Sequence, residues 1–245
     1  MSTIKQHQEM GYDRSAGMFS PDGLILQVEY AEKAVNLGST VIGITTKEGV
    51  VLIGDRRIKS KLLVKDSFKK VFEIDEHIAV TGAGAMSDGR RLIEEAQGIA
   101  QKHKVSYQNP IDTLSLVKDV ANIQQYYSQA GGLRPFGVSF LIGGYEDNQG
   151  FLYQTTPSGM YIRFLAYAIG SHSLKANEKL EEVYKDNMKT DDAIKMGLKV
   201  FKEVLGEDYS YERFDIATIT KEGFRRLDTT AVSYTHLRAH ETDSY

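Results

Sequence analysis

Apolar residues recur at helical spacing in five segments of the chain. In the first segment they lie three or four positions apart, as on one face of a helix, at Leu24, Val28, Ala31 and Val35. Gly38 follows and is expected to end this helix, because glycine readily adopts the backbone conformations found after a helix C-terminus. The same spacing predicts four more helices, over residues 92–103, 116–127, 176–183 and 194–205.

Short apolar runs between these helices predict strands. They cover residues 41–44, 50–53, 71–74, 77–81, 136–142, 151–153, 161–162, 168–169 and 214–220. Strands that come in runs argue against a doubly wound parallel sheet, in which strands and helices alternate. Two antiparallel sheets packed face to face between two helix pairs would bury every apolar face. We therefore predict an α+β fold, a four-layer αββα sandwich in one domain.

The ends and turns of these elements carry their own signals. Residues 1–13 show no periodicity and are predicted to form a flexible arm. Residues 20–23 (Ser-Pro-Asp-Gly) predict a turn, because proline presets φ at the first central position and glycine accepts a positive φ. The helix whose apolar face spans residues 116–127 is expected to start at Pro110 and to end at Gly131-Gly132.

Composition narrows the class of protein. The 245 residues are 41% hydrophobic and 26% charged, which is typical of a folded domain and not of a disordered chain. The absence of cysteine excludes disulfides, thiolate zinc sites and cysteine nucleophiles, and it fits a reducing compartment. A net charge of −3 gives no electrostatic reason to expect nucleic-acid or membrane partners. With no secretory signal and no apolar run of about 18 residues, we expect a cytoplasmic protein.

The usual cofactor motifs are missing. The histidines are scattered, and no acidic cluster has the spacing of a metal site, so neither a metal nor another cofactor is expected. Residues 81–86 (Thr-Gly-Ala-Gly-Ala-Met) follow a predicted strand as a phosphate loop does. They lack both the Gly-x-Gly-x-x-Gly spacing and the Gly-Lys-Ser/Thr ending, and are better explained as a tight strand-to-helix turn.

Asp55 and Lys70 are the most suggestive pair for chemistry, since each borders a predicted strand. A lysine near a buried carboxylate can have its pKa tuned for base chemistry. An N-terminal nucleophile hydrolase would need such a pair beside a residue freed by cleavage, here Ser39, whose free amino group would act as base. The alternative is a surface ion pair in a run already rich in lysine and arginine.

Several stretches together resemble the proteasome α subunits, and in particular the archaeal type in which one gene supplies a whole ring. They are residues 12–14 (Tyr-Asp-Arg), 19–23 (Phe-Ser-Pro-Asp-Gly), 27–31 (Gln-Val-Glu-Tyr-Ala), 38–40 (Gly-Ser-Thr), 131–138 and 168–171. The likeness extends from about residue 10 to residue 227. It implies the αββα sandwich of the N-terminal nucleophile hydrolase-like fold.

The resemblance implies a non-catalytic subunit. The α subunits form the seven-membered outer rings of the core particle, template the catalytic β rings, gate the access of unfolded protein substrates and dock ATPase activators. In that family the helix before Ser39 is retained and covers the opening that is the active-site mouth in β subunits. The alternative from another class is a β-like N-terminal nucleophile hydrolase processed before Ser39.

Two sets of site residues follow from the resemblance. Tyr12, Asp13, Arg14, Pro21 and Tyr30 match the gate cluster, which in the family holds the reverse turn and the arms of neighbouring subunits. Proline stiffens the turn and the tyrosines supply rigid amphipathic surface. Residues 1–11 would then be the arm that closes the axial pore.

The second set is the pocket that receives the C-terminal tails of an AAA ATPase regulatory particle. Lys70 matches the lysine that captures the terminal carboxylate, a role suited to its compact ammonium. Gly84 matches a glycine that allows close backbone approach, and Glu29 is expected at the rim.

The chain departs from the family pattern in two places. Leu24 stands where the signature has a basic residue, which puts the polar contact expected there in doubt. Residues 232–245 resemble a translated sequencing-library adapter rather than the acidic, lysine-rich tail of the family, and we interpret them as a non-native tail on a truncated gene. The predicted organisation is an arm over 1–13, a proteasome-type domain over 14–231 and this tail.

Overall fold

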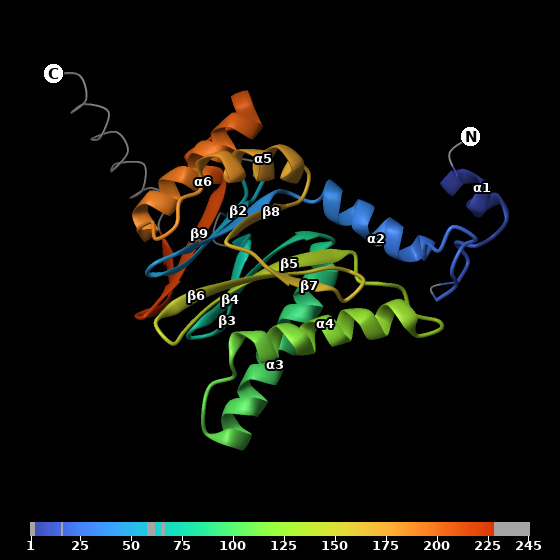
Figure 1. Ribbon diagram of the computed structural model, residues 1–245, viewed down its shortest axis with the longest axis horizontal. Helices are drawn as coiled ribbons and strands as arrows, with labels where there is room; N and C mark the ends of the chain where they lie inside the picture. The colour runs from blue at the N-terminus through green and yellow to red at the C-terminus, as the bar shows by residue number, and fades with distance from the viewer. Residues whose placement is uncertain (1–2, 16, 58–61, 65–66, 228–245) are drawn as a thin grey trace.

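The computed structural model describes residues 3–15, 17–57, 62–64 and 67–227. Two five-stranded antiparallel sheets pack face to face, and a pair of helices covers the outer face of each (Figure 1). This is the predicted four-layer αββα sandwich. The tail predicted over 232–245 lies outside the described residues.

The first sheet has the strand order β10-β9-β2-β1-β8. Its centre is the predicted hairpin of β1 (Val41–Thr46) and β2 (Gly49–Asp55). β9 (Phe214–Thr220) pairs with β2, and β8 (Ala166–Ile169) pairs with β1. β1 and β2 are buried at every position, because one face meets the other sheet and the opposite face meets helices.

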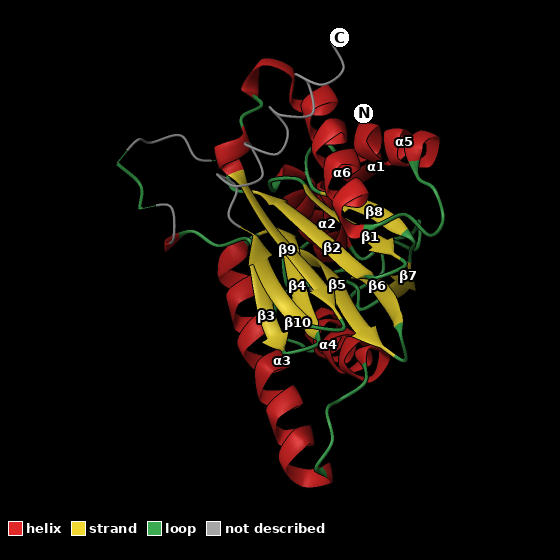
Figure 2. Ribbon diagram, turned by 90° about the vertical axis from the view of Figure 1, so that its left-hand side faces the viewer, coloured by secondary structure: helices red, strands yellow, loops and turns green. Residues whose placement is uncertain are grey.

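The second sheet has the order β3-β4-β5-β6-β7, in which every neighbouring pair is antiparallel and consecutive in the chain. Its members are β3 (Val71–Asp75), β4 (Ile78–Gly84), β5 (Val138–Glu146), β6 (Gln149–Thr155) and β7 (Tyr161–Arg163). The core between the two sheets is aliphatic and includes Leu52, Leu141 and Leu152. Figure 2 shows the two sheets stacked, with their strands running in similar directions.

The outer layers bury the remaining apolar faces. α3 (Met86–Tyr107) and α4 (Thr113–Gln129) cover the second sheet around Leu92, Leu116 and Phe140. α5 (Ser173–Val183) and α6 (Thr190–Leu205) cover the first sheet around Phe201 and Phe214, whose rings lie 4.7 Å apart. Among the described residues, no helix has the length and apolar character needed to cross a membrane.

The helix predicted to end at Gly38 is α2 (Leu26–Leu37). It lies across one end of the two sheets and packs against β4 and β5, with α1 (Thr3–Glu9) beyond its N-terminal end (Figure 1). Leu26, Ala31 and Val35 are its buried residues, and Val35 belongs to the core between the sheets. Gly38 caps the helix by donating its amide to Val35 O.

Three details differ from the sequence prediction. Thr3–Glu9 form the helix α1, although the periodicity of residues 1–13 did not predict one. α4 begins at Thr113, three residues after the predicted start at Pro110. The reason is that the Asp112 carboxylate accepts a hydrogen bond from Ser115 N and so caps the helix. A tenth strand, β10 (Gly223–Leu227), pairs with β9 and was not predicted, since its half-buried residues form no apolar run.

Candidate functional site

The turn at residues 20–23 is a small hairpin that leads into α2. Gly23 N donates to Ser20 O at 2.8 Å, and Ser20 N donates to Leu24 O at 2.8 Å. Phe19 and Ile25 then pair as an isolated antiparallel bridge. Pro21 occupies the first central position, and Gly23 has a φ of +76°, so each residue plays the structural part predicted for it. The Leu24 contact at this turn is made by its main chain and needs no basic side chain.

Side chains of α1 tie the N-terminal segment to this turn and to α2. His7 Nε2 lies 3.4 Å from Asp22 Oδ2 in the turn, and His7 is buried. The Tyr12 ring lies edge-on to the His7 ring at a centroid distance of 6.0 Å. Gln8 Nε2 donates to Tyr30 Oη at 2.5 Å. The structure thereby places Tyr12 and Tyr30 on the same N-terminal assembly.

Asp13 and Arg14 complete the predicted gate cluster. The main-chain carbonyl of Asp13 accepts a hydrogen bond of 2.5 Å from Gln27 Nε2 on α2. The contact is therefore made by the backbone of Asp13. Arg14 N donates to Gly11 O at 3.1 Å, and the Arg14 side chain is exposed. All five predicted residues lie around the turn, the N-terminal half of α2 and the segment that precedes them.

The C-terminal end of α2 meets the turn between β4 and α3 at van der Waals distance. A Cβ atom on Gly38 would lie 2.2 Å from Gly84 N, so the two backbones can approach only because residue 38 is glycine. Gly84 has a φ of +115°, and a Cβ atom on it would lie 2.1 Å from Gly137 O. The close backbone approach at Gly84 is therefore made within the chain, by Gly137, and its part in a tail-binding pocket stays a prediction.

Lys70 lies beside this turn and is only 2% exposed. Its Nζ donates to Gly82 O at 2.8 Å, and a Cβ atom on Gly54 would lie 2.6 Å from Lys70 Cβ. Burial lowers the pKa of Lys70 from 10.5 to about 8; the Asp55 carboxylate opposes this change and the Arg57 guanidinium adds to it. An ammonium has three donors, and Gly82 O is its one hydrogen-bond acceptor among the described residues.

Asp55 is also buried, with 1% exposure, and its partner is Arg213. Arg213 Nε and Nη2 donate to the two carboxylate oxygens at 2.7 and 2.8 Å, a bidentate pair, and Arg57 N donates to Oδ1 at 2.9 Å. Within the described residues no hydrogen bond joins Asp55 to Lys70. The two residues are close and buried, but they form neither the surface ion pair nor the direct catalytic pair suggested by the sequence.

Arg213 is the residue that sequence reasoning missed. It is the last residue of a short 3-10 turn (Tyr211–Arg213) directly before β9, and no motif marks it. It is also 158 residues away from its partner in the chain, so spacing gives no signal. Its effect is to hold the carboxylate of Asp55 in an ion pair, which leaves that carboxylate less able to tune a neighbouring base.

Glu29 lies apart from Lys70 and Gly84 within one chain. It is half-buried in the first turn of α2, nine residues before Gly38, which places it about 13 Å farther along the helix axis. Burial, with the nearby Glu29 charge, raises the pKa of Glu32 one turn later.

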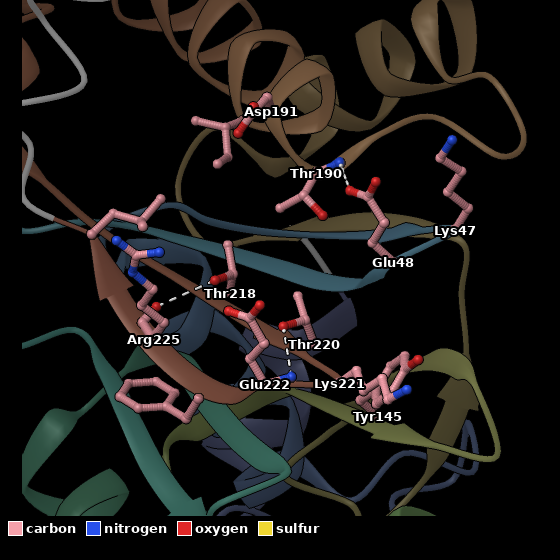
Figure 3. Close-up of a pocket in the computed structure, with 13 residues that line it drawn as sticks. Lys47, Glu48, Tyr145, Thr190, Asp191, Thr218, Thr220, Lys221, Glu222 and Arg225 are labelled. Atoms are coloured by element: carbon pink, nitrogen blue, oxygen red, sulfur yellow. Dashed lines mark hydrogen bonds between the residues drawn. The ribbon is translucent and has the colours of Figure 1, made fainter.

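A groove of about 650 Å³ lies elsewhere, at the opposite end of the first sheet (Figure 3). The loop between β1 and β2, the hairpin of β9 and β10, and the start of α6 line it. Glu48 Oε2 accepts a hydrogen bond from Thr190 N at 2.9 Å and caps α6, and this bond lowers the pKa of Glu48. Its charged side chains are of both signs, and it contains none of the predicted site residues. No group of three metal-ligating side chains occurs in the described part of the chain.

Comparison with known proteins decides the family. Residues 35–219 match the family model for proteasome subunits, and residues 12–34 match the model for the N-terminal signature of the A type of these subunits. The chain belongs to the proteasome α subunits. Its curated relatives, which are named as proteasome alpha subunits, include that of Methanopyrus kandleri, 40% identical over 91% of both chains. That of Archaeoglobus fulgidus is 44% identical over 82% of this chain and 83% of its own, and that of Methanothermobacter thermautotrophicus is 41% identical over 90% of both.

Membership of the proteasome α subunits makes this chain a non-catalytic member of the threonine-protease core particle. The hydrolase processed before Ser39 is therefore set aside. The structure supplies a physical reason, because cleavage there would remove α2 and uncover the core residues that it buries. The N-terminal signature contains all five predicted gate residues together with Glu29, and the longer match contains Lys70 and Gly84.

Proposed function

We propose that this chain forms the seven-membered outer ring of a cytoplasmic proteasome core particle. In this proposal the ring templates the β subunits, gates the access of unfolded proteins and docks the C-terminal tails of an AAA ATPase. Membership of the α subunits supports association with β subunits and with other α subunits. Nucleic acid and membranes have no part in the proposal.

The juxtaposition of Lys70 and Gly84 at the C-terminal end of α2 carries the docking part of the proposal. Lys70 Nζ is held beside the β4 backbone by Gly82 O, and two residues later Gly84 lets that backbone pass close to Gly137 of the chain leading into β5. A terminal carboxylate is an anion that a partly desolvated ammonium binds well, because water competes weakly there. Because Glu29 lies farther along α2, a pocket with all three residues would lie between two subunits.

The N-terminal assembly supports the gating part. The turn at 20–23, the segment around Tyr12 and the helix α1 are joined by contacts between single side chains, such as those of His7 and Gln8. Contacts of this kind have small net free energies, so a modest force at α2 can rearrange them. An arm that pivots about this assembly can open or close an axial pore.

The docking proposal is tested with Lys70→Met in core particles assembled with β subunits. Methionine keeps an apolar stem near Gly54 and removes the ammonium. Lys69→Met is the matched control, since the neighbouring Lys69 is exposed. We expect the Lys70 variant to lose ATPase-stimulated degradation of a folded substrate at least tenfold, while both variants cleave short peptides as the wild type does. Stimulation that survives in the Lys70 variant refutes the docking role.

A further inference from the structure

The side chain of Arg57 clamps the C-terminal end of α2. Its Nη1 donates to Leu37 O at 3.1 Å, and its Nη2 donates to Gly38 O at 3.3 Å. The same Nη2 also donates to Ser171 Oγ in the turn between β8 and α5. One guanidinium therefore joins the last carbonyls of α2 to the first sheet.

This end of α2 is where a cation has the largest effect. The last carbonyls of a helix lack partners within the helix and carry the negative end of its dipole. Gly38 N donates a hydrogen bond to Val35 O. Leu37 O and Gly38 O both accept hydrogen bonds from the Arg57 guanidinium, and Gly38 O also accepts one from Ser171 N at 2.9 Å. Arginine can serve both carbonyls at once because its donors form a rigid planar fork.

The backbone of Arg57 has an intrinsically unfavourable conformation where its side chain makes these hydrogen bonds. Its φ is +47°, in the left-handed region that non-glycine residues seldom adopt. Arg57 N donates to Asp55 Oδ1 at 2.9 Å, and the bidentate pair with Arg213 fixes that carboxylate. Asp55, which looked like a catalytic residue in the sequence, here supports the arginine that holds α2.

We propose that Arg57 is a positioning residue that fixes α2 across the end of the sandwich and so holds the gate assembly at the other end of α2 in its resting arrangement. The proposal rests on the gating role proposed above. Helices transmit displacement along their axis, and the turn at 20–23 leads directly into α2. Loosening the C-terminal end therefore shifts the N-terminal end that carries Tyr30.

The test compares Arg57→Ala and Arg57→Lys with the wild type. Amide hydrogen exchange is measured over α2 in the ring, with α6 as an internal reference. The assembled particle is then assayed without activator on a short fluorogenic peptide and on labelled casein, a long unstructured chain. We expect at least tenfold faster exchange in the last turn of α2 for Arg57→Ala, unchanged exchange in α6 and a several-fold higher ratio of casein to peptide cleavage. Arg57→Lys should restore part of both effects, because a single ammonium reaches one carbonyl.

Unchanged exchange in α2, equal acceleration in α2 and α6, or an unchanged casein-to-peptide ratio would each overturn the proposal. A purely structural role would lower the stability of the whole subunit without changing that ratio. The result is separable from the docking test. If Lys70→Met still responds to the ATPase while Arg57→Ala behaves as expected, the docking role of Lys70 is refuted and the positioning role of Arg57 is supported. If Lys70→Met fails to respond and Arg57→Ala resembles the wild type, the positioning role of Arg57 is refuted and the docking role of Lys70 is supported.

Discussion

The buried ammonium of Lys70 makes a quantitative prediction about stability and pH. Its pKa falls from 10.5 to about 8 in the folded chain, chiefly because burial penalises the charged form. At about 1.36 kcal/mol for each pH unit, this difference corresponds to about 3 kcal/mol. Below pH 8 the folded state carries the whole penalty, because Lys70 is charged in both the folded and the unfolded chain.

The sign of the pH dependence follows from proton counting. Between pH 8 and 10.5 the unfolded chain holds a proton on this lysine that the folded chain has lost, so the contribution of Lys70 to the free energy of unfolding rises with pH. Lys70→Met has no such titration. The difference in unfolding free energy, wild type minus variant, should therefore increase by about 3 kcal/mol between pH 7.5 and 10.5.

Urea unfolding at a series of pH values measures this difference, since the other lysines titrate alike in both proteins and cancel. Lys69→Met, which replaces an exposed neighbour, should follow the wild-type curve in parallel. A wild-type minus Lys70→Met difference that stays constant over this range would show that Lys70 is solvated in the folded state. It would remove the physical basis for treating it as a desolvated anion receptor.

Three other substitutions test the local structure. Gly84→Ala should lower the free energy of unfolding by at least about 3 kcal/mol, seen as a lower melting temperature, because its φ is positive and a carbonyl lies 2.1 Å from the new Cβ. Asp112→Ala should cost about 1 kcal/mol in urea unfolding, because it removes the cap of α4. Arg134 lowers the pKa of Asp88 through a paired hydrogen bond, so that stabilisation is present above the ordinary carboxyl pKa and is lost as pH falls. In Arg134→Met the free energy of unfolding should therefore fall less steeply than in the wild type as the pH is lowered. An equally steep fall in both proteins would contradict this role of Arg134.

Much of the fold was predictable because the strands and helices have clear apolar patterns. β2 is buried along its whole length, and its run of valine, leucine and isoleucine is the kind of pattern that local reasoning detects. β10 is different, since it is an edge strand with half-buried residues and is stabilised by pairing with β9. α1 is different as well, because single contacts such as that of His7 with Asp22 hold it, and periodicity does not detect such contacts.

The candidate site residues were predicted from a motif, whereas the polar partners that the structure shows in their neighbourhood were not predicted. Lys70 and Gly84 stand at recognisable positions, and the structure brings them together at the end of α2. Arg213 and Arg57 had no such signal, although Arg213 occupies both oxygens of Asp55 and Arg57 holds the helix. Long-range polar pairs depend on the tertiary arrangement of loops, which residue spacing does not encode.

A buried aspartate and a buried lysine can therefore either take part in catalysis or hold a segment of the chain in place. What decides between them here is the set of groups that meet each residue. Asp55 faces two arginines, one through a bidentate ion pair and one through a backbone amide, so its charge serves to hold the chain. Among the described residues the Lys70 ammonium donates to one carbonyl, that of Gly82, and no hydrogen bond joins it to Asp55. An aspartate held in this way is suited to positioning a helix, and a lysine that it does not hold is available for the docking role proposed above. Neither arrangement requires the pair to activate Ser39.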